Sequence, residues 1–219
     1  METKGRDNQL DQQYVIIGHI YHHSPLLSNQ MTIDVNYWST FYSSNHTLDA
    51  SNFCSFVLDF FKYQRCLRVL DAGCGNGRDT YALSEYYVTT GLDTAAYVPK
   101  ATETCSFETG DFCSYDKSTF DLIYSRFTLH SINDEQQEQF LSSITKRGTY
   151  LAIECRSDGD VDTVREHGDD HYRNFVSYER MLRLFDSLGF KVLFAEEGRG
   201  FAPYKSEDPV CVRFIVEKD

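Results

Sequence analysis

The sequence predicts an α/β fold in which a seven-stranded, mostly parallel sheet has helices on both faces and an antiparallel last strand. Three observations support this prediction. Short apolar stretches typical of strands alternate with helical stretches along most of the 219 residues. The last two predicted strands are joined by a connection without a helical pattern, which favours an antiparallel pair. The stretch Arg68–Asp79 has the pattern of a buried strand, a glycine turn and the start of a helix.

Each predicted strand corresponds to a short stretch rich in apolar residues. Val69 and Leu70 suit a first strand that is buried on both faces. Six more strands are expected at Val88–Asp93, Cys105–Thr109, Phe120–Ser125, Thr149–Glu154, Phe190–Ala195 and Val210–Val216.

The predicted helices precede or connect these strands. The helix expected at Ser51–Tyr63 carries Phe53, Phe56 and Phe60 on one face, and Gly189 ends the helix before the sixth strand. The aromatic stretch Asp34–Tyr42 is expected to be a helix packed on the core, a cap over a ligand, or both. The other helices are expected at Ser51–Tyr63, Asp79–Tyr87, Asp134–Thr145 and Ser177–Leu188.

The composition is that of one folded domain. Hydrophobic residues make up 41% of the chain and aromatic residues 15%, which is enough for a core. The net charge of -12 without a Lys/Arg cluster disfavours a nucleic-acid partner. No membrane span or secretory leader is expected, and the seven cysteines form no C-x-x-C pair, so a cytoplasmic location is predicted. We expect residues 1–30 to be an extension or linker and residues 31–219 to be one domain.

The spacing of the glycines in the turn selects the kind of ligand. Gly73, Gly75 and Gly77 follow G-x-G-x-G, which is neither the dinucleotide pattern G-x-G-x-x-G nor a P-loop ending in G-K-[ST]. Asp71, just before the glycines, would repel a pyrophosphate but would attract a cation. A ligand with an ammonium, a sulfonium and no phosphate, such as S-adenosylmethionine, fits this pattern.

The stretch VLDAGCGNGRDT resembles the first motif of class I S-adenosylmethionine-dependent methyltransferases. The resemblance implies a Rossmann-like fold, methyl transfer, S-adenosylmethionine as cofactor and S-adenosylhomocysteine as product. It also implies that the cofactor is bound by Asp71, Gly73, Gly75, Asn76, Arg78, Asp79, Asp93, Thr94, Asp111, Phe112, Ser125 and Arg126.

Two further acidic positions suit the nucleoside part of this cofactor. Asp93 ends the second strand at about the 20-residue interval at which a carboxylate meets ribose hydroxyls, and it also suits the N-cap of a segment starting at Thr94. By resemblance, Asp111 accepts a hydrogen bond from the adenine amine. Phe112 is then expected to pack on the adenine ring or donate its N–H.

Candidate bases lie near the ends of the fourth and fifth strands. In this family the end of the fourth strand lies beside the methyl group, which makes His130 a candidate base; a packed or capping histidine is the alternative. His171 is a second candidate and Glu154 a third. Two histidines favour O-methylation, because an alcohol must lose its proton during transfer.

The C-terminal part suggests an acceptor. DHYRNF and EEGRGFAPYKSEDPV resemble small methyltransferases associated with capsule, surface-polysaccharide and large-virus glycan biosynthesis. This resemblance implies methylation of a sugar hydroxyl, for example on a deoxyhexose such as rhamnose, in a glycan or nucleotide-sugar. The chain would then be a glycan-modifying enzyme or one domain of a longer one. The acceptor is expected to meet Tyr37, Trp38, Tyr42, Arg156, Tyr172, Arg173, Arg199 and Tyr204.

Two other functions remain open at this point. One is a methyltransferase for a small thiol or a metalloid oxyanion, and the other is an inactive methyltransferase fold that acts as a binding protein. No metal site is expected, because the acidic stretch from Asp158 to Asp169 has Thr163 where a calcium loop needs glycine.

Overall fold

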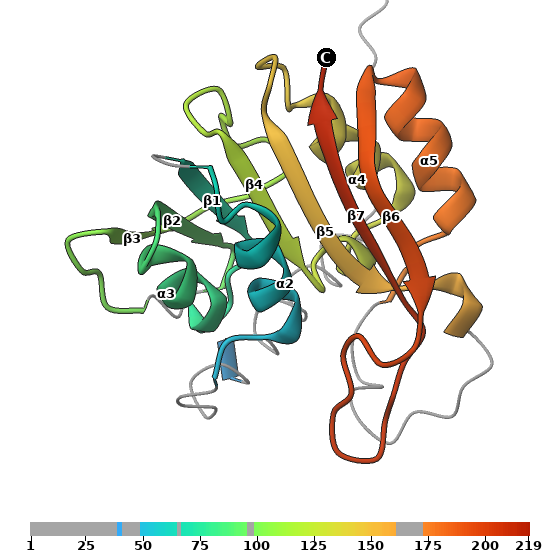
Figure 1. The fold of residues 1–219 in the computed structure, drawn as a ribbon, viewed down its shortest axis with the longest axis horizontal. Coiled ribbons are helices and arrows are strands. Elements are labelled where there is room, and N and C mark those ends of the chain that lie inside the picture. Colours follow the sequence, from blue (N-terminus) through green and yellow to red (C-terminus); the bar gives the residue numbers. More distant parts are fainter. Residues whose placement is uncertain (1–38, 41–48, 65–66, 96–98, 161–172) are drawn as a thin grey trace, which may run out of the picture.

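The computed structural model describes residues 39–40, 49–64, 67–95, 99–160 and 173–219, which form a sheet between two layers of helices (Figure 1). The strands are β1 (Arg68–Ala72), β2 (Val88–Asp93), β3 (Cys105–Thr109), β4 (Leu122–Arg126), β5 (Tyr150–Arg156), β6 (Phe190–Gly198) and β7 (Cys211–Lys218). The α-helices are α2 (Asn52–Phe60), α3 (Arg78–Ser84), α4 (Asp134–Ser142) and α5 (Tyr178–Ser187), with short 3₁₀ helices at Leu129–Ser131 and Asp158–Asp160.

The sheet has the strand order β3-β2-β1-β4-β5-β7-β6. Adjacent strands from β3 to β5 are parallel, and β7 runs antiparallel to both β5 and β6. The predicted fold class is therefore confirmed, including the antiparallel last strand. Because the first five strands are parallel, their carboxyl ends lie at one edge of the sheet, which is the edge where such folds bind ligands.

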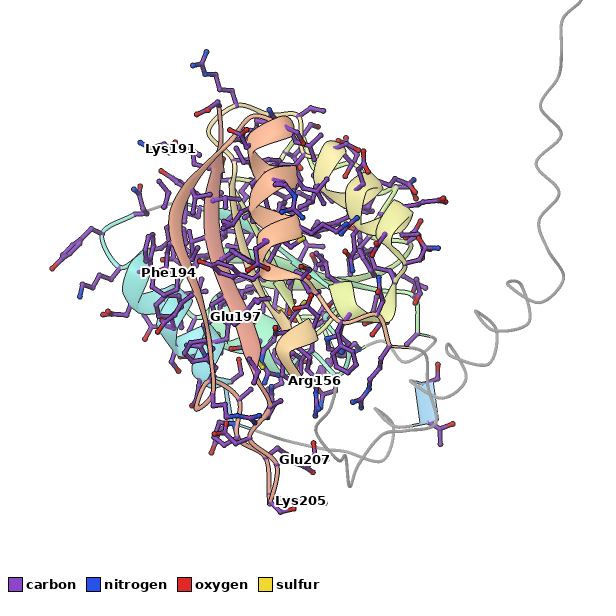
Figure 2. The ribbon with its side chains drawn as sticks, turned by 90° about the vertical axis from the view of Figure 1, so that its right-hand side faces the viewer. Arg156, Lys191, Phe194, Glu197, Lys205 and Glu207 are labelled. Carbon is purple, nitrogen blue, oxygen red and sulfur yellow. The ribbon has the colours of Figure 1, made fainter. Side chains whose placement is uncertain are left out.

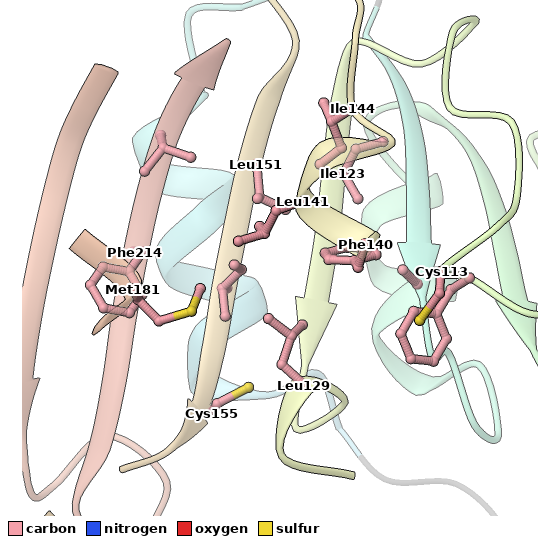
Figure 3. Close-up of a cluster of buried hydrophobic side chains, with 14 of the residues drawn as sticks. Cys113, Ile123, Leu129, Phe140, Leu141, Ile144, Leu151, Cys155, Met181 and Phe214 are labelled. Atoms are coloured by element: carbon pink, nitrogen blue, oxygen red, sulfur yellow. The ribbon is translucent and has the colours of Figure 1, made fainter. Parts of the chain in front are cut away.

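Apolar side chains cover both faces of the sheet. On one face, α2 and α3 contribute Phe53, Val57 and Leu83 to the core. On the opposite face, α4 and α5 contribute residues such as Phe140 and Met181 (Figure 3). Strands buried on both faces explain why their sequences are apolar without clear alternation.

Side-chain caps fix the beginnings of two helices. The Ser51 hydroxyl accepts the N–H of Cys54 at the start of α2. Asn133 and Gln136 form a reciprocal capping box at the start of α4. Each helix ends one to three residues before its predicted end, as is usual for fraying termini, whereas α4 begins at the predicted residue and α3 begins one residue earlier than predicted.

A loop of residues 199–210 joins β6 to β7 and extends beyond the carboxyl end of β5 (Figure 1). Tyr204 and Glu207 form a short antiparallel bridge within it. Among the described helices, none combines the length and apolar character that a bilayer crossing requires.

Candidate functional site

The glycine turn after β1 is tightly packed against its neighbours. Gly73, Gly75 and Gly77 all have positive φ angles, of 84°, 54° and 78°. The N–H of Gly73 donates to the Leu92 carbonyl at 2.8 Å, which ties the turn to the end of β2. A Cβ on Gly73 would lie 2.3 Å from Oγ1 of Thr128. The turn therefore needs glycine both for its backbone angles and for the close approach of the chain after β4.

Asp71 provides a buried carboxyl group beside this turn. Its side chain is on the face covered by α3, and its Oδ2 accepts the hydroxyl of Thr80 at 2.6 Å. Burial raises the pKa of Asp71 to about 8, although the hydrogen bond from Thr80 opposes the shift. A cation placed against this carboxyl would favour its ionised form, so Asp71 fits a ligand with an ammonium group.

Asp93 connects the glycine turn to the chain after β2. Its Oδ2 accepts the N–H of Gly75 at 2.8 Å and its Oδ1 accepts the N–H of Ala95 at 2.8 Å. The second bond is the capping contact that the sequence also suggested. Each carboxylate oxygen can accept more than one hydrogen bond, so Asp93 retains capacity for two ribose hydroxyls. Thr94, beside it, is exposed.

Asp111 and Phe112 follow β3, where the purine was expected. The carboxylate of Asp111 is exposed and accepts the N–H of Cys113 at 2.9 Å and the hydroxyl of Ser114 at 3.0 Å. The Phe112 ring is buried and packs edge-on against Phe140, with the ring centroids 5.6 Å apart. Phe112 was expected either to stack on the adenine ring or to donate its backbone N–H to it. The buried position of its ring disfavours stacking, so the N–H contact is the one that stays a prediction.

Asp79 links three elements of the fold. Its carboxylate accepts the N–H and hydroxyl of Ser51, at 2.8 and 2.7 Å, and the hydroxyl of Tyr124 at 2.7 Å. Its Oδ1 also lies 3.4 Å from Nε of Arg78. The protein itself therefore satisfies this carboxylate, whereas the sequence assigned it to the cofactor. Asn76 accepts the N–H of Arg78 at 3.3 Å and so shapes the last step of the turn.

The end of β4 holds a buried hydroxyl group. Ser125 is fully buried, and its Oγ has no hydrogen-bond partner among the described residues. After it, Phe127 adopts a left-handed backbone with φ of 57°. Thr128 donates to the Ala72 carbonyl at 3.0 Å and so joins this turn to β1. A buried polar atom without a partner next to a strained turn is typical of ligand sites.

The candidate bases differ in their surroundings. His130 is buried in the 3₁₀ helix after β4, with its ring centroid 5.4 Å from that of Phe127. Glu154 is fully buried, and its two oxygens accept hydrogen bonds from Arg126 and Arg213 at 2.8 and 2.7 Å. Accepting a substrate proton would remove the negative charge from between two guanidinium groups, so Glu154 is poorly suited to be a base.

Three of the predicted acceptor residues belong to the β6–β7 loop or bind it. Figure 2 shows Arg156 at the end of β5 and Glu207 in the loop, and Nη2 of Arg156 lies 2.7 Å from Oε2 of Glu207. Arg199 donates a short hydrogen bond to the carbonyl of Asp208. Tyr204 is 55% exposed near the tip of the loop. The ion pair holds the loop beside the carboxyl end of β5.

Some predicted site residues lie outside the described residues: Tyr37, Trp38, Tyr42, His171 and Tyr172. Arg173 is half-buried at the start of the segment 173–219. Sequence reasoning missed Arg213, although a single charge within the apolar strand CVRFIV indicates a buried polar contact. Within the ranges that the structure describes, no three His, Cys, Asp or Glu side chains gather in a way that would hold a metal ion.

Comparisons with known proteins agree with this geometry. Residues 69–147 match a family described as "Methyltransferase domain". A search of curated proteins gave no significant match.

Three solved structures share the fold. An S-adenosylmethionine-dependent methyltransferase from Anabaena variabilis is 18% identical, with a TM-score of 0.67 over 86% of this chain and 95% of that chain. The 1,6-didemethyltoxoflavin-N1-methyltransferase of Burkholderia thailandensis, solved with bound 1,6-didemethyltoxoflavin and S-adenosylhomocysteine, is 18% identical, with a TM-score of 0.63 over 87% of this chain and 91% of that chain. The [4+2]-cyclase SpnF is 14% identical, with a TM-score of 0.63 over 87% and 94%.

At these identities the structural likeness establishes the fold, and the cyclase illustrates that this fold also hosts other reactions. The enzyme class rests on the domain match, which covers the glycine turn, Asp93 and Asp111. The predicted class is confirmed: the chain contains a methyltransferase domain, and S-adenosylmethionine is its methyl donor.

Proposed function

We propose that this methyltransferase transfers a methyl group from S-adenosylmethionine to a hydroxyl oxygen of a sugar, in a glycan or a nucleotide-sugar. The observation that carries the choice of oxygen is the position of His130, which is buried directly after β4. The resemblance of residues 170–210 to glycan methyltransferases supports the choice of a sugar.

In this proposal, residues at the carboxyl ends of the parallel strands bind different parts of the methyl donor. Asp71 pairs with the ammonium group of the donor, Asp93 accepts from the ribose hydroxyls, and Asp111 with the Phe112 N–H meets the adenine. Two observations support binding of S-adenosylmethionine at this edge: Asp93 can accept further hydrogen bonds, and the buried Ser125 hydroxyl has no hydrogen-bond partner among the described residues. When bound, S-adenosylmethionine supplies an electrophilic methyl group. The chain aligns the acceptor oxygen with that group, and His130 takes the proton that the hydroxyl loses.

The assay that tests this function follows labelled methyl groups. Purified protein is incubated with methyl-tritiated S-adenosylmethionine and each of dTDP-rhamnose, a methyl rhamnoside, thiophenol and tellurite. Alkali-stable label on a sugar is expected. Label found only on thiophenol or on a volatile tellurium product would overturn the sugar assignment in favour of the small-molecule alternative. Absence of S-adenosylhomocysteine binding by calorimetry would instead indicate an inactive fold.

Replacing His130 with alanine is expected to lower kcat about a hundredfold, because general-base catalysis contributes at least that factor. The affinity for S-adenosylhomocysteine, measured by calorimetry, should change less than about threefold, because the proposed base touches the acceptor rather than the donor. Full activity of H130A would exclude His130 as the base and leave His171 as the predicted candidate.

The buried carboxyl of Asp71 predicts a pH dependence of cofactor binding. Its folded-state pKa of about 8 lies above its ordinary value of 3.8, so the protonated form is favoured in the ligand-free protein and its contribution to stability is lost as the pH rises toward 8. An ammonium group needs the ionised form, so affinity for S-adenosylhomocysteine should rise about tenfold from pH 6 to pH 7. Calorimetry in two buffers should detect release of about one proton per ligand bound at pH 7. D71N should bind weakly with no such release; proton release by D71N would contradict the assignment.

A further inference from the structure

Three charged side chains form a row across the carboxyl end of the sheet. Arg126 of β4 is paired in register with Glu154 of β5, and Glu154 is paired with Arg213 of β7. Their side chains lie on the face that α2 covers, because Tyr124 and Ile215, two residues from them along the strands, belong to the core under α2. The row is thus part of the edge where the proposed acceptor binds.

This row carries an unbalanced positive charge. Oε1 of Glu154 lies 2.8 Å from Nε of Arg126, and Oε2 lies 2.7 Å from both Nε and Nη2 of Arg213. One carboxylate therefore serves two guanidinium groups. Glu196 of β6 is paired in register with Arg213 but is exposed, and no ion pair joins the two side chains among the described residues. Asp79 already accepts hydrogen bonds from Ser51 and Tyr124 and is paired with Arg78. Charge that is taken out of water normally requires a partner, so the remaining positive charge calls for an anion.

The two arginines are not equivalent. Arg213 is enclosed, because its guanidinium lies 4.5 Å from the ring centroid of Phe201 and 5.4 and 5.3 Å from those of Phe53 and Phe56. Its Nη2 also donates to the Phe201 carbonyl at 3.1 Å. Arg126 has 19% of its side chain exposed. Within the part of the chain that the structure describes, its guanidinium makes one hydrogen bond, through Nε to Glu154. The terminal nitrogens of Arg126 are therefore the part of the row available to a ligand.

The local backbone holds Arg126 at the position of the proposed chemistry. The next residue, Phe127, has the left-handed φ of 57°, and its N–H donates to the Glu154 carbonyl at 2.8 Å. The centroid of the Phe127 ring lies 4.3 Å from the Arg126 guanidinium and 5.4 Å from the centroid of the His130 ring. Arg126 and the proposed base thus share one aromatic neighbour at the end of β4.

We propose that the acceptor carries a carboxylate or phosphate group and that Arg126 binds it, with Glu154 as a positioning residue that fixes the guanidinium. This inference rests on the proposed function and narrows its acceptor to anionic sugars, such as a sugar phosphate or a uronic acid. A guanidinium binds both anions through two parallel hydrogen bonds, which would also orient the sugar hydroxyl relative to His130. It departs from the sequence-based assignment of Arg126 to the cofactor.

The test uses the protein saturated with S-adenosylhomocysteine and measures sugar binding by calorimetry. The probes are glucose 1-phosphate, glucuronate and the neutral methyl glucoside. We expect at least one anionic probe to bind at least about tenfold more tightly than the neutral one, and R126Q to abolish this difference. The anionic probe that binds more tightly shows whether Arg126 prefers a phosphate or a carboxylate. The control is R68Q, the same change at the amino end of β1, which should leave all three affinities unaltered.

Two results would overturn the proposal. One is equal binding of the neutral and anionic probes to the wild-type protein, or an anion preference that survives in R126Q. The other is a loss of affinity for S-adenosylhomocysteine in R126Q as large as its loss for the anionic sugar, which would assign Arg126 to the carboxylate of the donor. Failure of the proposed function is distinguishable, because it would appear as absence of S-adenosylhomocysteine binding or of methyl transfer in the wild-type protein.

Discussion

Replacing Glu154 with glutamine is expected to lower the free energy of unfolding by about 3–5 kcal/mol. The side chain is fully buried and is the shared hydrogen-bond acceptor of Arg126 and Arg213. Glutamine keeps the size but removes the charge, so the guanidinium groups of the buried Arg213 and the partly buried Arg126 would face each other without compensation. Urea unfolding followed by circular dichroism at pH 7 would measure the change, which is a large part of the 5–15 kcal/mol typical of a domain.

The matched control for this change is Glu196→Gln. Glu196 is paired in register with Arg213 from the other side of β7, but it is exposed, so its loss should cost no more than about 0.5 kcal/mol. The double variant E154Q/R126Q should recover part of the lost stability, because it removes one of the two repelling charges. If E154Q unfolds at the same urea concentration as E196Q, the buried ion row does not stabilise the fold.

Replacing Asp93 with alanine should weaken binding of S-adenosylhomocysteine at least about a hundredfold. Two ribose hydroxyls that donate to a charged acceptor are each worth about 1.5–3 kcal/mol. The change also removes the acceptor for the N–H of Gly75, which helps to hold the glycine turn. Calorimetry would measure the affinity, and thermal unfolding should confirm that the variant remains folded.

Asp116→Ala is the control for Asp93→Ala. Asp116 lies in the exposed loop before β4, and its carboxylate accepts the N–H of Ser118. Replacing it with alanine therefore removes a similar hydrogen bond to a backbone N–H, but outside the glycine turn. We expect its cofactor affinity to match that of the wild-type protein. A change below threefold in D93A would refute the ribose assignment.

Local patterns were sufficient for most of the fold. The observed β2 and β3 coincide with the predicted Val88–Asp93 and Cys105–Thr109. The prediction for β6 ended at Ala195, whereas the strand continues to Gly198 because Glu196 and Glu197 pair with β7. Polar residues at a sheet edge carry no local signal of a strand, so this extension depends on a partner strand that sequence patterns do not reveal.

The candidate site was less accessible to sequence reasoning, because pairs that are distant in the sequence decide it. The motif placed Asp71 and Asp93 beside the glycine turn, as the structure has them. The surroundings of Asp79 depend on Ser51, 28 residues away, and those of Glu154 depend on Arg213, 59 residues away. A single sequence gives the charge of such residues but not the side chains with which they form hydrogen bonds or ion pairs.

The interior position of β7 has a consequence for how the chain reaches its folded state. This last strand inserts between β5 and β6, and it supplies Phe214 to one core and Ile215 to the other. During synthesis, the earlier strands can assemble only with β5 exposing an unpaired apolar edge, which remains open until β7 emerges. Truncation before Cys211 would therefore yield an aggregation-prone polypeptide rather than a shorter working enzyme.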